Sequence, residues 1–534
     1  MRKIYALITI MQFLLALTAA AQVPGTLDTT FNGTGKFIHD YGFQDNLSDV
    51  KVQPSDQKIV ITGTAITTSF SGKLLVARLT TDGVFDTTFN GTGSLIIPDF
   101  NESYGYECQI KSDGKILIAG AAADPQFQFS MVVLRVNEDG TIDSTFGTNG
   151  MVVPEISTGD DFANAMVEQP DHKIVLAGTA LDSAARNEPV VVRLNENGSI
   201  DSTFGVNGVV RIPVTEIDNE LNAVVIQPDG KIVVSGHWDM GLTSGGQFDF
   251  DVIVARFNSN GSVDSTFGLN GMVLTSASID NIDDAFGMQL TADGNIVVSG
   301  FTTQPNYTYD ALLLQYDSTG TLDAGFGNNG IVIFDNAVQD VAYDVELQGD
   351  GKILIGGTSG GFFFDDRDYL LARYNMDGSV DTTFGTNGFT LTTIYTGFDE
   401  ANGMAIQQDG KIILAGKGYN GSQNDIAVTR HLNDFASGIS EPITSGNMQV
   451  FPNPVLSGQV ITITRESGFA SNTSIGIYDL SGKEVGNITT SNLSAAQNQL
   501  TFQLPKQLVP GFYFLRAVSE NSVNSICKIL VTGN

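Results

Sequence analysis

The stretch GSIDSTFGVNG, Gly198 to Gly208, decides the fold because it is one of seven related copies in the chain. The other copies begin at Gly25, Gly83, Gly140, Gly261, Gly320 and Gly378. The intervals between copies run from 57 to 63 residues. A second signature alternates with the first, as in QPDGKIVVSG from Gln227. Self-similarity at a fixed period of this length is the mark of a repeat architecture.

The sequence of one unit predicts four antiparallel strands. In the fourth unit, NAVVIQ and KIVVSG flank a PDG turn, and DVIVARF and MVLTS flank the repeated motif. Runs such as Ile232-Val233-Val234 are apolar at successive positions, so both faces of the sheet must be covered. No helical periodicity interrupts this pattern. Sheets covered on both faces by their neighbours form either an open stack or a closed ring.

The order of the two signatures favours the ring. The chain begins with the motif at Gly25, before any Asp-Gly-Lys turn, and the seventh unit ends at Asp434 without the motif that should follow. If residues 25–38 supply the outer strand of the last sheet, no exposed sheet edge remains. We therefore predict an all-β protein in which residues 22–434 form a seven-bladed β-propeller closed by its N-terminal strand.

The repeated GxxDxTFGxNG, together with DGKI and a following Gly, resembles the delta-60 family of propeller repeats found in secreted bacterial proteins. The resemblance covers about four fifths of the chain. It implies a propeller and no particular activity.

Three residues of each repeat, an Asp, a Phe and an Arg, are expected to be structural. Asp-Gly and Asn-Gly give turns with positive φ, the motif Asp can accept backbone N–H groups, and the motif Phe can fill the space between blades. A buried Arg needs a carboxylate partner, and the motif Asp has the same period. The predicted pairs draw on Asp28, Asp86, Asp143, Asp201, Asp264, Asp323 and Asp381, and on Arg78, Arg135, Arg193, Arg256, Arg373 and Arg430, with Gln315 in the fifth blade.

The N-terminal residues predict export. MRKIYALITIMQFLLALTAAAQ has two basic residues, a short apolar run and small residues, which is the pattern of a signal peptide over residues 1–21 with cleavage after Ala21. No other segment is apolar and long enough to cross a bilayer, so no span is expected in the mature protein.

The C-terminal residues predict a second domain. A Gly-, Ser- and Pro-containing linker covers residues 435–447, and alternating apolar residues over 448–534 predict a small β-sandwich. Its motifs VFPNPV (with Pro452, Asn453 and Pro454), IGIYDLSGKEV and LVPGFYFLRAVS (with Gly511) resemble the type A sorting domain of the type IX secretion system. The resemblance implies that the outer-membrane secretion machinery is a partner. It also implies passage through the periplasm of a Gram-negative bacterium to the cell surface or the medium. An ordinary carbohydrate-binding sandwich is the alternative, because fold alone does not separate the two.

Composition excludes some functions. The net charge of -32 repels nucleic acid and anionic lipid, so neither is an expected partner. The two cysteines, Cys108 and Cys527, are too few for a disulfide framework, and we expect two separate buried thiols.

Catalytic and metal motifs are missing from the sequence. None of the four histidines shares a recognisable motif with a nucleophile, and there is no zinc-type spacing or phosphate loop, so no catalytic, metal-ligating or cofactor residues are predicted. Calcium remains open, because NEDGTID at 137–143 places acidic and amide oxygens at alternating positions, although other blades lose them.

A ligand site is expected on the face that carries the variable loops. In a meander, the repeated turns lie on one face, while the loops between second and third strands and the blade connections lie on the other. Binding residues favour variable loops on rigid scaffolds. The candidate residues on that face are His237, Trp238, Asp239, Asp283, Asp284, Tyr307 and Tyr309. The alternative for Trp238, the only Trp in the chain, is that it packs its own loop.

Three functions remain open at this point. The first is a non-catalytic secreted or surface propeller that binds a glycan or a protein through these loops. The second is a polysaccharide hydrolase or lyase, which should place two carboxylates in a deep axial pocket. The third is a structural or adhesive surface protein.

Overall fold

The computed structural model is all-β and describes most of residues 23–532. The segments left out of that range are 67–70, 244, 279–280, 305–307, 338, 362–365, 435–447, 452–454, 470–473, 479–483, 490–496, 507, 509–510 and 520–521. The predicted signal peptide with Ala21, the predicted linker, Tyr307 and the Pro452-Asn453-Pro454 motif therefore lie outside the described residues. Within the described part, no helix is long and apolar enough to span a membrane.

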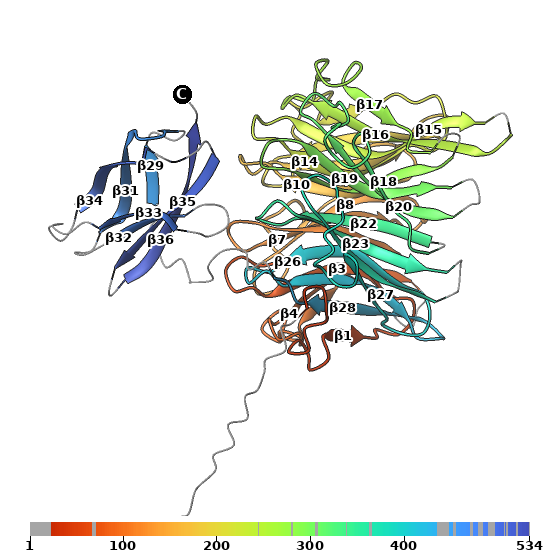
Figure 1. The fold of residues 1–534 in the computed structure, drawn as a ribbon. Helices are drawn as coiled ribbons and strands as arrows, with labels where there is room; N and C mark the ends of the chain where they lie inside the picture. The colour runs from red at the N-terminus through yellow and green to blue at the C-terminus, as the bar shows by residue number, and fades with distance from the viewer. Residues whose placement is uncertain are drawn as a thin grey trace, which may run out of the picture.

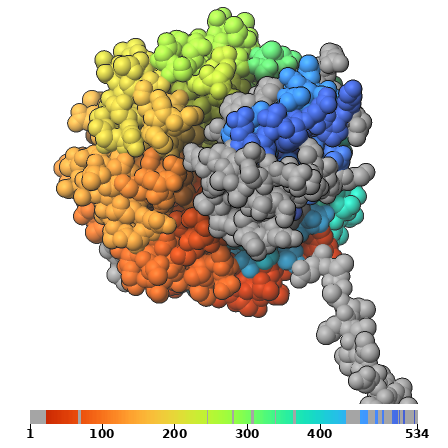
Figure 2. Space-filling model, turned by 90° about the vertical axis from the view of Figure 1, so that its left-hand side faces the viewer, coloured from red at the N-terminus to blue at the C-terminus, as the bar shows by residue number. Residues whose placement is uncertain are grey.

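The predicted seven-bladed propeller is confirmed (Figure 1). Blade 1 contains β2 (Asn46–Val52), β3 (Ile59–Ile66), β4 (Gly72–Leu79) and β5 (Ser94–Ile96), and blade 2 contains β6 (Ser103–Ile110), β7 (Ile116–Ala123), β8 (Phe129–Val136) and β9 (Met151–Val152). Blade 3 contains β10 (Asp161–Glu168), β11 (Ile174–Leu181), β12 (Asn187–Leu194) and β13 (Val209–Arg211), and blade 4 contains β14 (Glu220–Ile226), β15 (Ile232–Leu242), β16 (Phe248–Phe257) and β17 (Met272–Thr275). Blade 5 contains β18 (Asp283–Leu290), β19 (Ile296–Thr303), β20 (Tyr309–Tyr316) and β21 (Ile331–Phe334), and blade 6 contains β22 (Gln339–Leu347), β23 (Ile353–Gly360), β24 (Arg367–Tyr374) and β25 (Phe389–Thr392). Blade 7 contains β26 (Asp399–Ile406), β27 (Ile412–Tyr419) and β28 (Asn424–His431). Every blade is an antiparallel meander, and Figure 2 shows the blades following one another around the molecule in chain order.

The middle strands of each blade are buried on both faces, as their unbroken apolar runs predict. In β15, the residues from Ile232 to His237 are all buried, and β16 is buried from Val252 to Phe257. Side chains on the two faces of one blade enter different hydrophobic clusters, each shared with the adjacent blade. The core of the propeller is therefore a ring of inter-blade layers.

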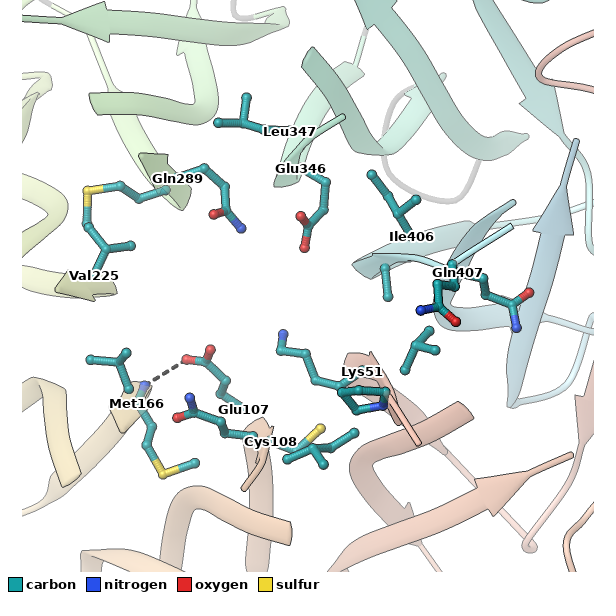
Figure 3. A pocket seen from close by; sticks show the side chains of 18 of the residues that line it. Lys51, Glu107, Cys108, Met166, Val225, Gln289, Glu346, Leu347, Ile406 and Gln407 are labelled. Carbon is teal, nitrogen blue, oxygen red and sulfur yellow. Dashed lines mark hydrogen bonds between the residues drawn. The ribbon is translucent and has the colours of Figure 1, made fainter. Parts of the chain in front are cut away.

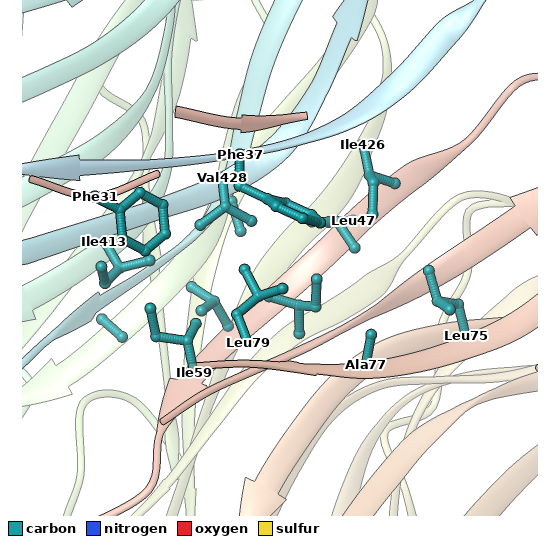
Figure 4. Close-up of a cluster of buried hydrophobic side chains, with 14 of the residues drawn as sticks. Phe31, Phe37, Leu47, Ile59, Leu75, Ala77, Leu79, Ile413, Ile426 and Val428 are labelled. Carbon is teal, nitrogen blue, oxygen red and sulfur yellow. The ribbon is translucent and has the colours of Figure 1, made fainter. Parts of the chain in front are cut away.

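The N-terminal strand closes the ring. β1 (Lys36–His39) pairs antiparallel with β28 and completes the sheet of blade 7, so β1 and β28 lie side by side in Figure 1. Figure 4 shows the cluster behind this closure, in which Phe31 and Phe37 meet Leu47 of blade 1 and Val428 of blade 7. The predicted closure by the N-terminal strand is confirmed by this pairing.

The repeated motif joins one blade to the next. Arg193 Nε lies 2.8 Å from Asp201 Oδ2, and the guanidinium carbon lies 4.5 Å from the centre of the Phe204 ring. Asp201 Oδ1 accepts hydrogen bonds from the backbone N–H and the hydroxyl of Thr203. A second guanidinium nitrogen donates to the backbone oxygen of Ser259 in the following blade. Equivalent Arg–Asp contacts of 2.7 to 2.8 Å join Arg78–Asp86, Arg135–Asp143, Arg256–Asp264, Arg373–Asp381 and Arg430–Asp28, and Gln315 replaces Arg opposite Asp323.

A separate β-sandwich follows the propeller. One sheet has the order β29 (Met448–Phe451), β31 (Val460–Phe469), β34 (Gln497–Gln503). The other has the order β30 (Val455–Leu456), β36 (Ser522–Thr532), β35 (Gly511–Ser519), β32 (Ser474–Tyr478), β33 (Glu484–Thr489). Ile461 and Ile463 of one sheet pack with Ile475, Leu515 and Ile529 of the other. Gly511, which lies in a motif of the predicted sorting domain, begins β35, the strand that pairs with β36.

Candidate functional site in the axial channel

The first strands of the seven blades surround a channel along the axis of the propeller. Two cavities of about 680 Å³ and 500 Å³ share the lining residues Lys51, Glu107 and Glu346, so they lie end to end along the axis. We call its ends the repeat face, where the Asp-Gly turns lie, and the loop face, where the first strands begin. The cavity at the repeat face includes Gln348, and the cavity at the loop face includes Glu220.

A β-bulge in each first strand sets which side chains enter the channel. The pairing register shifts at the same place in all seven blades, because one extra residue there has no partner on the second strand. All seven bulged residues line the loop-face cavity, and they are Ser48, Tyr106, Asn164, Asn222, Phe286, Tyr343 and Asn402. The mouth of the channel thus combines aromatic rings with side-chain amides.

The amides of the bulged residues tie neighbouring blades together. Asn164 Nδ2 donates to Glu220 Oε1 at 2.6 Å and to the backbone oxygen of Leu221 at 3.1 Å. Asn402 Nδ2 donates to the backbone oxygen of Leu47 at 2.8 Å, which links blade 7 to blade 1. The aromatic members have no such amide, so blades 2, 5 and 6 present ring surface to the channel at this level.

Three blades carry a carboxylate directly after the bulge. Asp49, Glu107 and Asp344 each accept a backbone N–H from the first strand of the next blade, at 2.9, 2.7 and 2.8 Å. The other four blades have Ala165, Ala223, Gly287 and Gly403 at this position. Charge therefore enters the channel from only three of the seven blades at this level.

Lys51 and Glu346 lie deeper in the channel. Lys51 Nζ lies 2.7 Å from Asp49 Oδ1, and Figure 3 shows Lys51, Glu107, Gln289 and Glu346 directed toward the same space. Burial, with the neighbouring carboxylates, raises the pKa of Glu346 to about 8. Burial also raises the pKa of Glu107 to about 8, although Lys51 opposes the shift. Both glutamates can therefore hold a proton near neutral pH.

An ion pair between His237 and Asp284 lies behind the mouth of the channel. His237 Nδ1 lies 3.2 Å from Asp284 Oδ2, and the imidazole stacks on Phe250 with ring centres 4.9 Å apart. Burial opposes protonation of His237, but Asp284, Glu220 and Asp218 raise its pKa to about 9. The protonated imidazole thus faces Glu220, whose carboxylate lines the channel.

The loop-face residues predicted to bind a ligand lie in different environments. His237 and Asp284 are brought together as described, while half-buried Trp238 packs against the cluster shared by blades 3 and 4. Asp239 accepts the backbone N–H of Gly241, and Asp283 accepts those of Ala277 and Ser278. The ring of Tyr309 lies 4.9 Å from that of Phe301. Of the six candidates that the structure describes, none lines the channel.

The channel residues were missed because their signal is weak in sequence. SDVKVQ, YECQIK and YDVELQ, the first strands of blades 1, 2 and 6, have charged residues where NAVVIQ and NGMAIQ have small or apolar ones. This departure from the repeat is visible in the sequence. Its meaning depends on the bulge, which local patterning does not reveal.

The NEDGTID turn, which left calcium open, is satisfied internally. Asp139 Oδ1 accepts hydrogen bonds from the backbone N–H of Thr141 at 3.0 Å and from its hydroxyl at 2.6 Å. These contacts explain the acidic and amide residues of the repeat turns as turn-forming groups.

Comparison with protein families identifies both parts of the chain. The domain of unknown function (DUF5122) beta-propeller matches seven times, at residues 55–89, 111–146, 169–204, 227–267, 291–326, 348–384 and 407–434. The chain belongs to the DUF5122 beta-propeller family. Residues 449–532 match the secretion system C-terminal sorting domain. This DUF5122 propeller is therefore exported by type IX secretion to the cell surface or the medium, and the secretion machinery is a partner of its C-terminal domain.

Wider comparisons give distant structural matches. No curated protein sequence matches the chain. Among solved structures, a fungal alcohol oxidase in complex with copper is 14% identical with a TM-score of 0.41, covering 93% of this chain and 98% of the other. A polysaccharide lyase of family PL25, an ulvan lyase bound to -[GlcA(1-4)Rha3S]-, is 11% identical with a TM-score of 0.39, covering 74% and 96%. Likeness at this level assigns no activity to the DUF5122 propeller.

Proposed function

We propose that this exported propeller binds a carbohydrate chain at the loop-face mouth of its axial channel. The observation that carries the proposal is the ring of bulged residues, which places Tyr106, Phe286 and Tyr343 beside Asn164, Asn222 and Asn402 in one cavity. The apolar face of a sugar ring packs against an aromatic ring, and its hydroxyls exchange hydrogen bonds with amides and carboxylates. Concave sites with aromatic walls and a few fixed polar groups are typical of ligand binding.

The aromatic residues form a continuous wall on one side. The rings of Phe286 and Tyr343 lie 5.1 Å apart, and Phe286 also stacks on Phe301 at 5.9 Å. Phe286 and Tyr343 are half-buried, so part of each remains accessible from the channel. A wall of this kind can hold a sugar ring without rearrangement.

Electrostatics favour neutral or cationic sugars. Glu220 and Glu400 line the same mouth, and the whole chain carries a net charge of -32. A field of this sign repels an anionic polysaccharide and attracts a protonated amine. We therefore expect neutral or amino sugars to bind better than uronic acid or sulfated chains.

The test is glycan binding by the purified mature chain, measured on an array of neutral, amino and acidic glycans and then by calorimetry. Phe286→Ala and Tyr343→Ala should each weaken binding about tenfold or more, because aromatic side chains dominate such contacts. Phe127→Ala is the matched control, since Phe127 is an exposed aromatic residue that does not line the channel. Absence of any glycan binding, or equal losses in all three variants, contradicts the proposal.

A second candidate function is a hydrolase or lyase that uses the deeper carboxylates. Glu107 and Glu346 line one channel, and the raised pKa values of about 8 would keep carboxylic acids available as proton donors at neutral pH. Turnover of a bound glycan should then produce new reducing ends or unsaturated ends. Glu346→Gln should abolish this turnover and leave binding intact, whereas a purely binding protein shows no turnover in either form.

A further inference from the structure

Three aspartates meet where blades 5 and 6 join, away from the axial channel. Asp310 lies in β20, Asp335 follows β21, and Asp340 lies in β22. One carboxylate oxygen from each lies within 4.8 Å of the other two. Asp310 and Asp340 are buried, and Asp335 is exposed. The parallel bridge between Tyr309 and Gln339 places the two buried residues opposite each other.

The described residues offer this group no cationic side chain as an ion-pair partner. Within the described part of the chain, no ion pair joins any of the three aspartates to Lys, Arg or His. Three carboxylates so close together repel one another strongly when all are ionised. The group is therefore costly at neutral pH without a counter-ion.

Asp340 offers an unused ligand atom. The side chain is 0% exposed, and Oδ2 accepts the backbone N–H groups of Asn336 at 2.7 Å and Ala337 at 2.9 Å. Oδ1 is also buried and accepts no hydrogen bond of good geometry, although the Ser359 hydroxyl interacts with this carboxylate. A buried polar atom without a partner is unfavourable unless another ligand satisfies it.

The neighbouring blade contact shows what differs here. Between blades 4 and 5, a parallel bridge from Phe250 to Ile282 brings Asp251 and Asp283 together in the same way. In that contact, Ser276 stands at the position of Asp335. Burial raises the pKa of Asp251, and a hydrogen bond from the Ser276 side chain partly offsets this rise. The third carboxylate is thus an addition to the repeated arrangement, at the one place among the described residues where three acidic ligand atoms converge.

We propose that Asp310, Asp335 and Asp340 bind a calcium ion that links blades 5 and 6. All three ligand atoms are carboxylate oxygens, which suit hard cations and not zinc or copper. Calcium accepts irregular oxygen cages more readily than magnesium, which requires near-ideal octahedral geometry. Backbone oxygens and water would complete the coordination. The site is independent of the proposed glycan function.

The test compares thermal unfolding of the purified mature chain in EDTA, in calcium and in magnesium, each up to about 10 mM, the range that suits weak extracellular sites. Calcium should raise the melting temperature of the wild type by several degrees, and magnesium should do so less. Asp335→Asn should lose most of the calcium shift and melt no lower than the wild type in EDTA, because it removes repulsion. Asp335 is exposed, so this change is not expected to prevent folding.

Two further variants sharpen the result. Asp171→Asn, which removes an exposed carboxylate elsewhere, should retain the full calcium shift. Ser276→Asp should create a second site with Asp251 and Asp283 and add to the calcium-dependent shift. Terbium in place of calcium should show emission sensitised by the adjacent Tyr309, and Asp335→Asn should remove it. A wild type without a calcium shift, or an equal shift in the wild type and Asp335→Asn, overturns the proposal.

Discussion

Arg430 and Asp28, which are 402 residues apart in the sequence, form a buried ion pair with 2.8 Å between Nε and Oδ2. The same pair within one blade, Arg193 and Asp201, spans eight residues with the same separation. Gly25 packs against Phe384 of blade 6 as Gly198 packs against Phe146 of blade 2. The N-terminal segment therefore reproduces, across the closure, the ion pair and the glycine–phenylalanine packing that the motif makes inside the chain.

Deletion of residues 22–40 should destabilise the whole propeller. The deletion removes Asp28, the Phe31 ring and β1, so β28 becomes an exposed edge and Arg430 is left as an unpaired buried charge. We expect a lower midpoint in denaturant and increased aggregation. Equilibrium unfolding followed by far-UV circular dichroism and by intrinsic fluorescence measures the effect. Unchanged cooperative unfolding would contradict closure by this strand.

Substitution of a motif arginine should depend on whether the new side chain can still donate to Asp. Arg193→Met leaves Asp201 with only the partly exposed Lys173 as a cationic partner. Breaking a buried pair costs about 3 to 5 kcal/mol when no partner remains, so we expect a loss near the lower end of that range. Arg193→Gln should cost less, because Gln315 Nε2 already donates to Asp323 at 2.8 Å in blade 5. Urea unfolding of the two variants gives the comparison. Equal losses would show that the charge, and not the hydrogen bond, stabilises the joint.

The repeat made most of the fold predictable. The phase of the two signatures indicated where the ring closes, and the shared period of Arg and Asp indicated their pairing, because each contact recurs wherever the motif recurs. The axial site was not predictable in this way. The position of Glu107 in the channel follows from a bulge at Tyr106, and the meeting of Asp310 with Asp340 follows from a bridge between two blades. Neither feature has a local sequence signal.

The loop-face prediction was limited for a related physical reason. The sequence shows that acidic residues gather at the starts of the blades, but it does not show which of them are already used. One carboxylate oxygen of Asp283 already accepts two backbone N–H groups, and the carboxylate of Asp284 already pairs with His237. Glu220, one residue after Asn219, does line the channel. Their roles as ligand-binding residues stay predictions.

The first glycine of the motif should tolerate a methyl group poorly. Gly198 has φ of +88°, and an added Cβ would lie 2.4 Å from Val152 Cγ2 and 3.0 Å from the Phe146 ring. Gly230 has a similar φ of +83°, but its added Cβ would meet only Ser259 at 3.7 Å. Both Ala variants should lose about 1 to 2 kcal/mol of stability, because alanine must then adopt the left-handed backbone conformation. Gly198→Ala should lose a further 1 to 3 kcal/mol, roughly the cost of overpacking. Equal free energies of unfolding for the two variants would show that blades are not packed through this glycine.

A buried blade-start aspartate should make stability depend on pH in an unusual direction. Asp399 is 0% exposed, and its Oδ2 accepts the backbone N–H groups of Ile394 at 2.6 Å and Tyr395 at 3.0 Å. Burial raises its pKa to about 7, while these hydrogen bonds oppose the shift. The folded state therefore keeps a proton that the unfolded state releases above about pH 4, so this group's contribution falls as the pH rises toward 7.

Asp399→Asn should remove that dependence, because blade 4 carries Asn219 at the same position and an amide oxygen can still accept a backbone N–H. We expect the melting temperature of the variant, relative to the wild type, to be several degrees higher at pH 8 than at pH 5. Asp201→Asn is the opposite control. Although burial opposes its ionisation, hydrogen bonds from Thr203 and Lys173 and the charge of Arg193 hold the pKa of Asp201 well below its usual value. The stabilisation by Asp201 is therefore complete at both pH values, and its loss should be equal at pH 5 and pH 8. A pH-independent difference for Asp399→Asn would mean that Asp399 is ionised in the folded protein throughout this range.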